Sequence, residues 1–161
     1  MYKKSFFLAV LSVISVGLVI TASGYISGWS GGNVPSHFDS GLTVEQATHQ
    51  SSQPLLIEFY SDSCGTCKEL TPKIHNVQTQ FKNKATFVMV DVYGKQSFVA
   101  DLFKIDVIPT LYLFDPKHMQ KIEIPSKYLY NEGDLSKGID RGLGQLSACV
   151  ANKNALEICR K

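Results

Sequence analysis

Hydrophobic residues recur in two patterns along residues 42–146. Short apolar runs of strand length occupy residues 55–60, 86–92, 111–114 and 121–124. Between these runs, apolar residues recur every three or four positions, which is typical of one face of a helix. Strands that alternate with helices and end in a hairpin predict an α/β domain. Its mixed central sheet is expected to be flanked by helices on both faces.

Several details place these elements more closely. The run at 86–92 is apolar at nearly every position, which is typical of a central parallel strand, and the run at 121–124 is expected at the sheet edge. A capping-box pattern at residues 43–46 predicts the start of a short helix. Pro72 lies inside the first long helical stripe and is expected to kink that helix. The two long stripes are Cys67, Leu70, Ile74, Val77 and Phe81, and then Leu135, Ile139, Leu143 and Leu146.

A separate apolar segment, residues 1–26, precedes this domain. Lys3 and Lys4 carry its charge, and residues 5–26 are uncharged over about the length that spans a bilayer. We interpret the segment as an uncleaved single-pass membrane anchor, and the alternative is a signal peptide removed near residues 22–24. Lys3 and Lys4 are expected to stay in the cytoplasm, which places the rest of the chain on the exported side of the membrane. The natural setting is the periplasmic face of a bacterial inner membrane, or the periplasm itself if the segment is cleaved.

Composition divides the remaining chain into three segments and argues against some classes of binding partner. Residues 27–41 are rich in Gly and Ser and predict a tether, residues 42–147 a folded domain, and residues 148–161 a cysteine-containing tail. The net charge of +2 comes from Lys3 and Lys4, so the domain is neutral and gives no electrostatic case for binding nucleic acid. The sequence has no glycine-rich dinucleotide fingerprint, so no cofactor is expected.

Two cysteines follow the first strand at a spacing of three. Cys64 is expected at the start of a helix, where the unpaired N–H groups and the helix dipole lower the pKa of a thiol. Cys67, one turn later, would be the more buried, resolving thiol. The alternatives are a purely structural disulfide or half of a zinc site. Zinc needs about four ligands at suitable spacing, and the four histidines are scattered, so no metal site is predicted. The pattern favours thiol–disulfide exchange.

These residues carry a resemblance to a known family. Phe59-Tyr60, the motif Cys64-Gly65-Thr66-Cys67-Lys68 and Pro72 resemble the active-site strand, motif and kinked helix of thioredoxins. Residues 108–114 resemble the cis-proline loop of that family and its following strand. The resemblance covers roughly residues 42–146 and implies a thioredoxin fold. One departure is Ser63, because thioredoxins usually carry Trp just before the first cysteine.

The resemblance also implies roles for residues beyond the two cysteines. Pro109 would be cis and would bring the backbone of Ile108 beside the cysteines, where it pairs with an extended substrate; the alternative is a trans proline at a strand start. Gly65 and Thr66 would contact the substrate as well. Glu58 occupies the position of a buried acid that relays the proton of the resolving thiol, and the alternative is a solvent-facing strand residue.

The tail carries the second pair of cysteines, Cys149 and Cys159, beyond the closing helix. We interpret them as a structural disulfide that fixes a short terminal segment. The sharper alternative is a second redox pair that passes electrons to Cys64 and Cys67. The tail has neither a CxxC motif nor a helix start at a cysteine, which favours the structural disulfide.

Together these features predict an exported, membrane-tethered thiol–disulfide oxidoreductase that acts as a monomer. We expect it to reduce disulfides of exported proteins, in redox homeostasis or in cytochrome c maturation. Its electrons would come from a membrane thiol transporter of the DsbD/CcdA type. The alternatives are a periplasmic disulfide oxidase or isomerase, and a non-catalytic module that uses the thioredoxin cleft to bind a partner.

Overall fold

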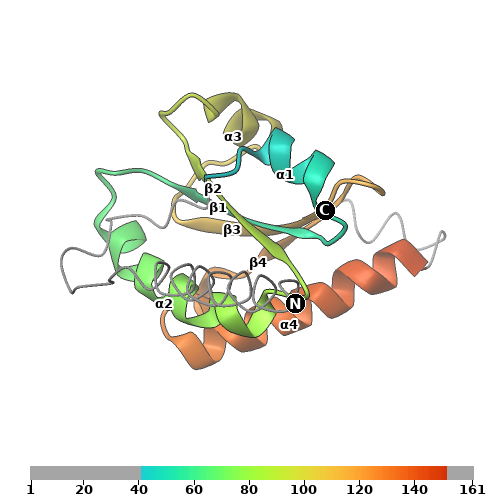
Figure 1. The fold of residues 1–161 in the computed structure, drawn as a ribbon. Coiled ribbons are helices and arrows are strands. Elements are labelled where there is room, and N and C mark those ends of the chain that lie inside the picture. The colour runs from blue at the N-terminus through green and yellow to red at the C-terminus, as the bar shows by residue number, and fades with distance from the viewer. Residues whose placement is uncertain (1–40, 152–161) are drawn as a thin grey trace, which may run out of the picture. The chain divides into compact units, whose positions relative to one another are not determined.

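The structure is a computed structural model, and it describes residues 41–151. The predicted anchor at 1–26, nearly all of the tether and Cys159 fall outside these residues. Helices and strands alternate along the chain (Figure 1). In order they are α1 (Val44–Gln50), β1 (Leu55–Tyr60), α2 (Gly65–Phe81), β2 (Thr86–Asp91), α3 (Ser97–Phe103), β3 (Thr110–Asp115), β4 (Gln120–Ile124), the short 3-10 helix η1 (Ser126–Tyr128) and α4 (Glu132–Ala151).

The strands form a mixed four-stranded sheet in the order β2-β1-β3-β4. β1 pairs with β2 in parallel and with β3 in antiparallel, and β3 and β4 form an antiparallel pair. Helices α2 and α4 cover one face of the sheet, and α1 and α3 cover the other (Figure 1). The predicted thioredoxin fold, with helices on both faces of a mixed sheet, is confirmed.

The expected central position of the second strand is wrong for the described part of the chain. β2 lies at one edge of the sheet, next to β1. Its apolar run is explained by burial on both faces, because Phe87 belongs to the core beneath α2 and α4 while Val88 and Val90 belong to the core beneath α1 and α3. A continuous apolar run therefore reports two covered faces and not a central position. β4 occupies the opposite edge, as predicted.

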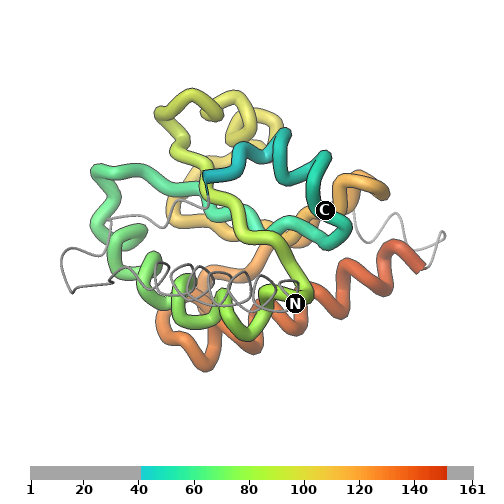
Figure 2. The backbone as a smooth tube through the Cα atoms, in the orientation of Figure 1, coloured from blue at the N-terminus to red at the C-terminus, as the bar shows by residue number. Residues whose placement is uncertain are grey.

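Alternation along β1 divides its side chains between the two cores. Leu55, Ile57 and Phe59 pack under α1 and α3, and Leu56 packs under α2 and α4. Successive strand residues point to opposite faces, so Glu58 shares the face of Leu56. The chain then leaves the sheet at the end of β1 and turns into α2 (Figure 2).

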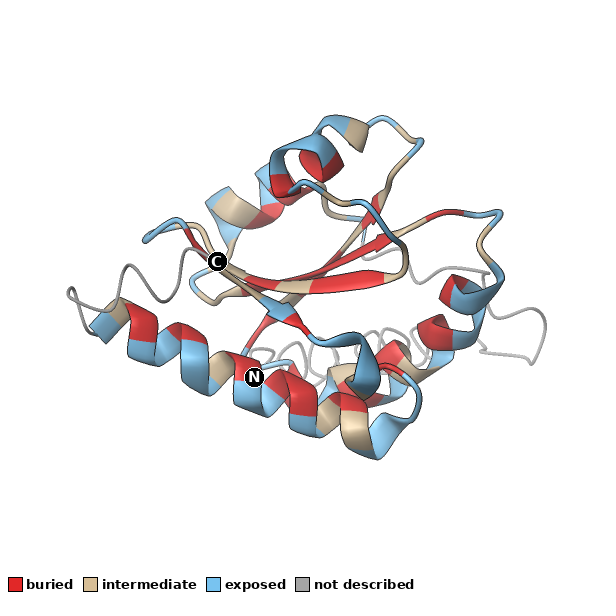
Figure 3. Ribbon diagram, turned by 180° about the vertical axis from the view of Figure 1, so that it is seen from behind, coloured by how far each residue is buried: buried red, intermediate tan, exposed pale blue. Residues whose placement is uncertain are grey.

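The first helical stripe is confirmed, because all five of its members are buried in α2 (Figure 3). Pro72 lies inside this helix, which continues through it to Phe81. The α1 capping box is also present, with Thr43 and Gln46 exchanging side-chain and backbone hydrogen bonds.

Helix α4 differs from the prediction in two respects. Gly142, and not Leu143, takes the position closest to the sheet, because a Cβ atom there would lie 2.7 Å from side-chain carbons of Leu113 and Ile124. The helix also continues to Ala151, so Cys149 lies within it and not beyond it. The buried spacing from Leu146 to Cys149 keeps the helical period, and residues 147 and 148 are small residues compatible with a helix.

No helix within residues 41–151 is both long and apolar enough to cross a bilayer. The anchor predicted for residues 1–26 lies outside this part of the chain and stays a prediction.

Candidate active site

The turn between β1 and α2 presents Cys64 at the start of the helix. The buried Ser61 shapes the turn, since its carbonyl accepts a hydrogen bond from the Cys64 N–H at 3.0 Å and its hydroxyl lies 3.0 Å from that of Ser63. Cys64 is the N-cap of α2, and its sulfur accepts a hydrogen bond from the Cys67 N–H at 3.1 Å. The sulfur therefore lies at the positive end of the helix dipole, where a thiolate is stabilised.

Cys64 and Cys67 form a disulfide with an S–S distance of 2.11 Å. Cys64 is partly accessible, whereas Cys67 is fully buried against the sheet. Gly65 and Thr66 between them are exposed, and the Thr66 hydroxyl lies 3.3 Å from the Cys64 sulfur. Of the two sulfurs, Cys64 is the one that an incoming substrate can reach.

Glu58 is buried in the middle of β1, with 2% of its surface exposed. The alternative of a solvent-facing strand residue is therefore wrong. Burial raises the pKa of its carboxyl to about 8, and neither carboxylate oxygen has a hydrogen-bond partner among the described residues. The carboxyl is thus protonated at neutral pH and can exchange a proton just above it. It shares the side of the sheet that α2 covers with the buried Cys67.

The proline loop lies beside the active-site turn because of strand pairing. Phe59 of β1 is paired with Thr110 of β3, so Pro109 lies opposite the end of β1, where the turn to Cys64 begins. The Ile108–Pro109 peptide bond is cis, as the resemblance implied. The Thr110 hydroxyl donates a hydrogen bond to the Val107 carbonyl at 2.7 Å and fixes the end of the loop.

This geometry agrees with the comparisons to known proteins. The sequence profile of the Thioredoxin family matches residues 37–139. The chain belongs to the thioredoxin family.

Its relatives include several thioredoxin-like proteins. Thioredoxin-like protein HCF164, chloroplastic, from Arabidopsis thaliana is 30% identical over 125 residues, which cover 71% of this chain and 48% of the relative. Thioredoxin 1 of Chlorobaculum tepidum is 33% identical over 72 residues, covering 45% of this chain and 70% of the relative. Among solved structures, chloroplastic thioredoxin z superposes with a TM-score of 0.52 at 17% identity, covering 70% of this chain and 93% of the other. This chain thus spans about half the length of the HCF164 relatives, and the structural match supports the fold alone.

Two further residues of this thioredoxin domain were missed in the sequence. Ser61 and Thr110 hold the turn and the proline loop through side-chain contacts to nearby backbone. A Ser directly after a strand is a known turn signal, whereas nothing local marks Thr110.

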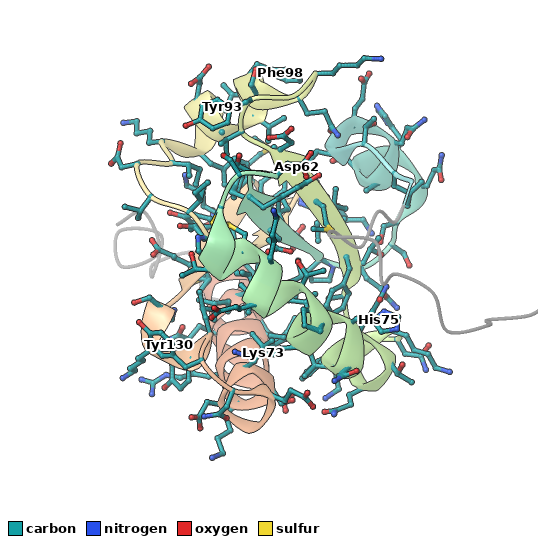
Figure 4. All side chains as sticks on the ribbon, turned by 90° about the vertical axis from the view of Figure 1, so that its left-hand side faces the viewer. Asp62, Lys73, His75, Tyr93, Phe98 and Tyr130 are labelled. Atoms are coloured by element: carbon teal, nitrogen blue, oxygen red, sulfur yellow. A yellow bond between two sulfur atoms is a disulfide. The ribbon has the colours of Figure 1, made fainter. Side chains whose placement is uncertain are left out.

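Two exposed aromatic side chains follow β2, and the sequence patterns gave no role to either. Tyr93 and Phe98, which follow β2, are 82% and 56% exposed and lie on the same side of the view as Asp62 of the turn (Figure 4). Lys73 and Tyr130 lie lower in that view, where the Lys73 ammonium donates a hydrogen bond to the Tyr130 carbonyl at 2.7 Å and joins α2 to the start of α4.

Cys149 is buried in α4, while Cys159 lies outside the described residues, so their predicted pairing stays a prediction. Within residues 41–151 no group of three or more His, Cys, Asp or Glu side chains is placed to hold a metal ion.

Proposed function

We propose that this thioredoxin-family chain is a thiol–disulfide oxidoreductase that reduces disulfide bonds of exported proteins. The observation that carries the proposal is the asymmetry of the cysteine pair. Cys64 is accessible and lies at a helix start with an N–H directed at its sulfur, and Cys67 is buried one turn away. The Cys64 sulfur can react with a protein disulfide, while the Cys67 sulfur is shielded from solvent until the second exchange.

The reaction proceeds in two exchanges from the reduced protein. The Cys64 thiolate attacks one sulfur of the substrate disulfide, forms a mixed disulfide and releases the first substrate thiol. Cys67 then attacks the Cys64 sulfur and releases the second. The substrate gains two electrons, and the protein is left with the Cys64–Cys67 disulfide. A dithiol donor must supply two electrons to restore it.

Glu58 has the properties that the second exchange requires. Cys67 must lose its proton before it attacks, and a buried carboxylate can accept that proton when its pKa lies near the operating pH. Burial places the pKa of Glu58 at about 8. Its lack of a hydrogen-bond partner in the described chain leaves both oxygens free to take part.

The proposal also includes the location of the domain and the source of its electrons. The apolar segment at residues 5–26, preceded by two lysines, supports an exported domain on a membrane anchor. A domain in that position receives electrons from a membrane thiol transporter of the DsbD/CcdA type. The similarity to the thioredoxin-like protein HCF164 and to Thioredoxin 1 of Chlorobaculum tepidum supports thiol–disulfide exchange, and the reducing direction is part of our proposal.

The reduction potential of the full chain, equilibrated against a glutathione series in detergent, tests the direction. We expect roughly −250 mV or lower, near thioredoxin. A value above about −180 mV would make the protein an oxidase or isomerase.

Single serine variants test the roles of the cysteines. Both Cys64→Ser and Cys67→Ser should abolish turnover, and Cys67→Ser alone should accumulate a mixed disulfide with insulin on a non-reducing gel. Trapping by the Cys64→Ser protein would reverse the assignment, and undiminished partner binding without wild-type turnover would favour a binding module.

A further inference from the structure

Lys121 of β4 reaches across to the end of α3. Its ammonium group donates a hydrogen bond to the Phe103 carbonyl at 3.0 Å. The same nitrogen lies 4.7 Å from the centre of the Phe103 ring and 5.1 Å from that of Tyr112. One carbonyl and two aromatic rings thus contact the same ammonium group. A lysine on the surface of a strand usually extends into solvent, so these contacts indicate that the position of Lys121 is fixed.

The accepting carbonyl belongs to the last residue of α3. The next residue, Lys104, takes the left-handed conformation with φ 59°, and its N–H and that of Ile105 bond back to earlier carbonyls of the helix. Carbonyls in the last turn lack partners within their own helix. The Lys121 ammonium supplies one for Phe103, and it also matches the negative end of the helix dipole.

The loop that carries the cis proline begins at this point. Residues 105–109 connect α3 directly to β3. The far end of the loop is fixed by the hydrogen bond from Thr110 to the Val107 carbonyl. Lys121 fixes the near end from a strand eighteen residues later in the chain. The path of Ile108 and Pro109, opposite the end of β1, is therefore set by one anchor on each side.

We propose that Lys121 is a positioning residue for substrate binding, which holds the end of α3 so that the Ile108–Pro109 loop keeps its place beside Cys64. The inference rests on the proposed function, because it concerns how that same site binds a protein disulfide. Lys121 acts on the side of the sheet that α3 covers, with Phe103 and Tyr112, whereas Cys67 and Glu58 lie on the side that α2 covers. It should therefore affect binding and leave the cysteine chemistry unchanged.

Three variants of the full chain test this assignment. Lys121→Met keeps the aliphatic stem and removes the donor, and Lys121→Arg keeps a charged donor. Lys127→Met is the matched control, since Lys127 also lies over an aromatic ring, that of Tyr128 at 5.1 Å, but on a different part of the fold. For each we would measure KM and kcat with insulin, the rate with oxidised glutathione, and the reduction potential.

Lys121→Met should raise KM for insulin about threefold to tenfold, in line with loss of one charge-assisted hydrogen bond. The kcat, the rate with oxidised glutathione and the potential should stay at the wild-type values. Lys121→Arg should recover most of the KM, and Lys127→Met should match the wild type. An unchanged KM, or parallel losses with insulin and glutathione, would overturn the assignment.

Amide hydrogen exchange tests the anchoring role of Lys121 without relying on reductase activity, so it distinguishes failure of this inference from failure of the proposed function. If the wild type reduces no disulfide, the proposed function falls, and exchange still decides the structural part of the inference. Lys121→Met should then speed exchange in residues 104–110 by about threefold or more while Lys121→Arg does not. Equal exchange in all variants would overturn the anchoring role.

Discussion

Glu58 and Lys121 are ionisable residues on opposite faces of one sheet, and their surroundings differ: Glu58 is buried without a partner in the described chain, and Lys121 is half-buried with several. Glu58 lies beneath α2 with no hydrogen-bond partner in the described chain, and burial raises its pKa to about 8. Lys121 lies on the α3 side with a carbonyl and two rings around its ammonium. Partial desolvation lowers the pKa of Lys121, and its contacts keep the group in a fixed place.

The different surroundings of the two residues fit their different proposed roles: Glu58 transfers a proton, and Lys121 holds a loop in position. An unpartnered buried acid is costly, and it persists where its proton is used. Lys121 makes a geometric connection instead, through the contacts that hold its ammonium group. In the proposed function, one side of the sheet supports the thiol chemistry, and the other supports the loop that is expected to receive the substrate.

The largest expected effect is a change in how stability depends on pH. Glu58 titrates near 4.5 when unfolded and near 8 when folded, so the folded state binds the extra proton and loses stability as pH rises between these values. Glu58→Gln should remove this loss and be more stable than the wild type at about pH 9 by roughly 4 kcal/mol. Urea unfolding of the reduced proteins at about pH 5 and pH 9 measures it. Parallel pH profiles would show that Glu58 is not an unpartnered acid.

The same variant should slow the reaction at the second exchange. Without a carboxylate to take the Cys67 proton, release of the mixed disulfide should fall about tenfold to hundredfold. Rapid acid quenching with an excess of insulin, read on non-reducing gels, separates formation of the mixed disulfide, which should stay near the wild-type rate, from its resolution. If only the rate of mixed-disulfide formation fell, Glu58 would act in substrate binding, and its role would no longer differ from that of Lys121.

Close packing of α4 on the Glu58 side of the sheet can be tested with a pair of glycines. A Cβ atom at Gly142 would meet Leu113 and Ile124 at 2.7 Å, whereas Gly144 on the same helix has open space. Gly142→Val should lower the free energy of unfolding by about 2 kcal/mol, and Gly144→Val should leave it nearly unchanged. Chemical denaturation of both variants provides the measurement. Equal effects would mean that α4 lies less tightly on this face.

The smallest effect belongs to the partnered lysine. Lys121→Met leaves the Phe103 carbonyl without its donor and should lower the free energy of unfolding by about 1 kcal/mol. Lys121→Arg should cost less than half of that. Unlike the effect of Glu58→Gln, this loss should be the same at about pH 5 and pH 7. A pH-dependent loss in that range would assign Lys121 a titrating role and remove the distinction between the two groups.

The sequence predicted what depends on local patterns. The boundaries of β1, the buried stripe of α2 and the helix start at Cys64 follow from apolar spacing and from the turn between them. The identity of Cys64 as the accessible thiol follows from the same local order. The resemblance added the cis bond before Pro109, which no spacing could have indicated.

Features that depend on packing between distant elements could not be predicted in this way. The strand pattern left Glu58 facing either solvent or core, and the answer depends on α2 covering that face. The contact between Lys121 and Phe103 joins two elements and leaves no periodic trace in the sequence. Gly142 has a role only because α4 approaches β3 and β4 so closely at that point.

The full burial of Cys67 has a consequence for survival under oxidative stress. Peroxide that reaches the reduced protein meets Cys64 first, because Cys64 is the accessible sulfur, and converts its thiolate to a sulfenic acid. Cys67, one helical turn away, can condense with that group, expelling water and forming the Cys64–Cys67 disulfide. The product is the ordinary oxidised form of the protein. Damage that would otherwise progress to irreversible sulfinic acid is thereby returned to a disulfide that any dithiol reductant can reduce.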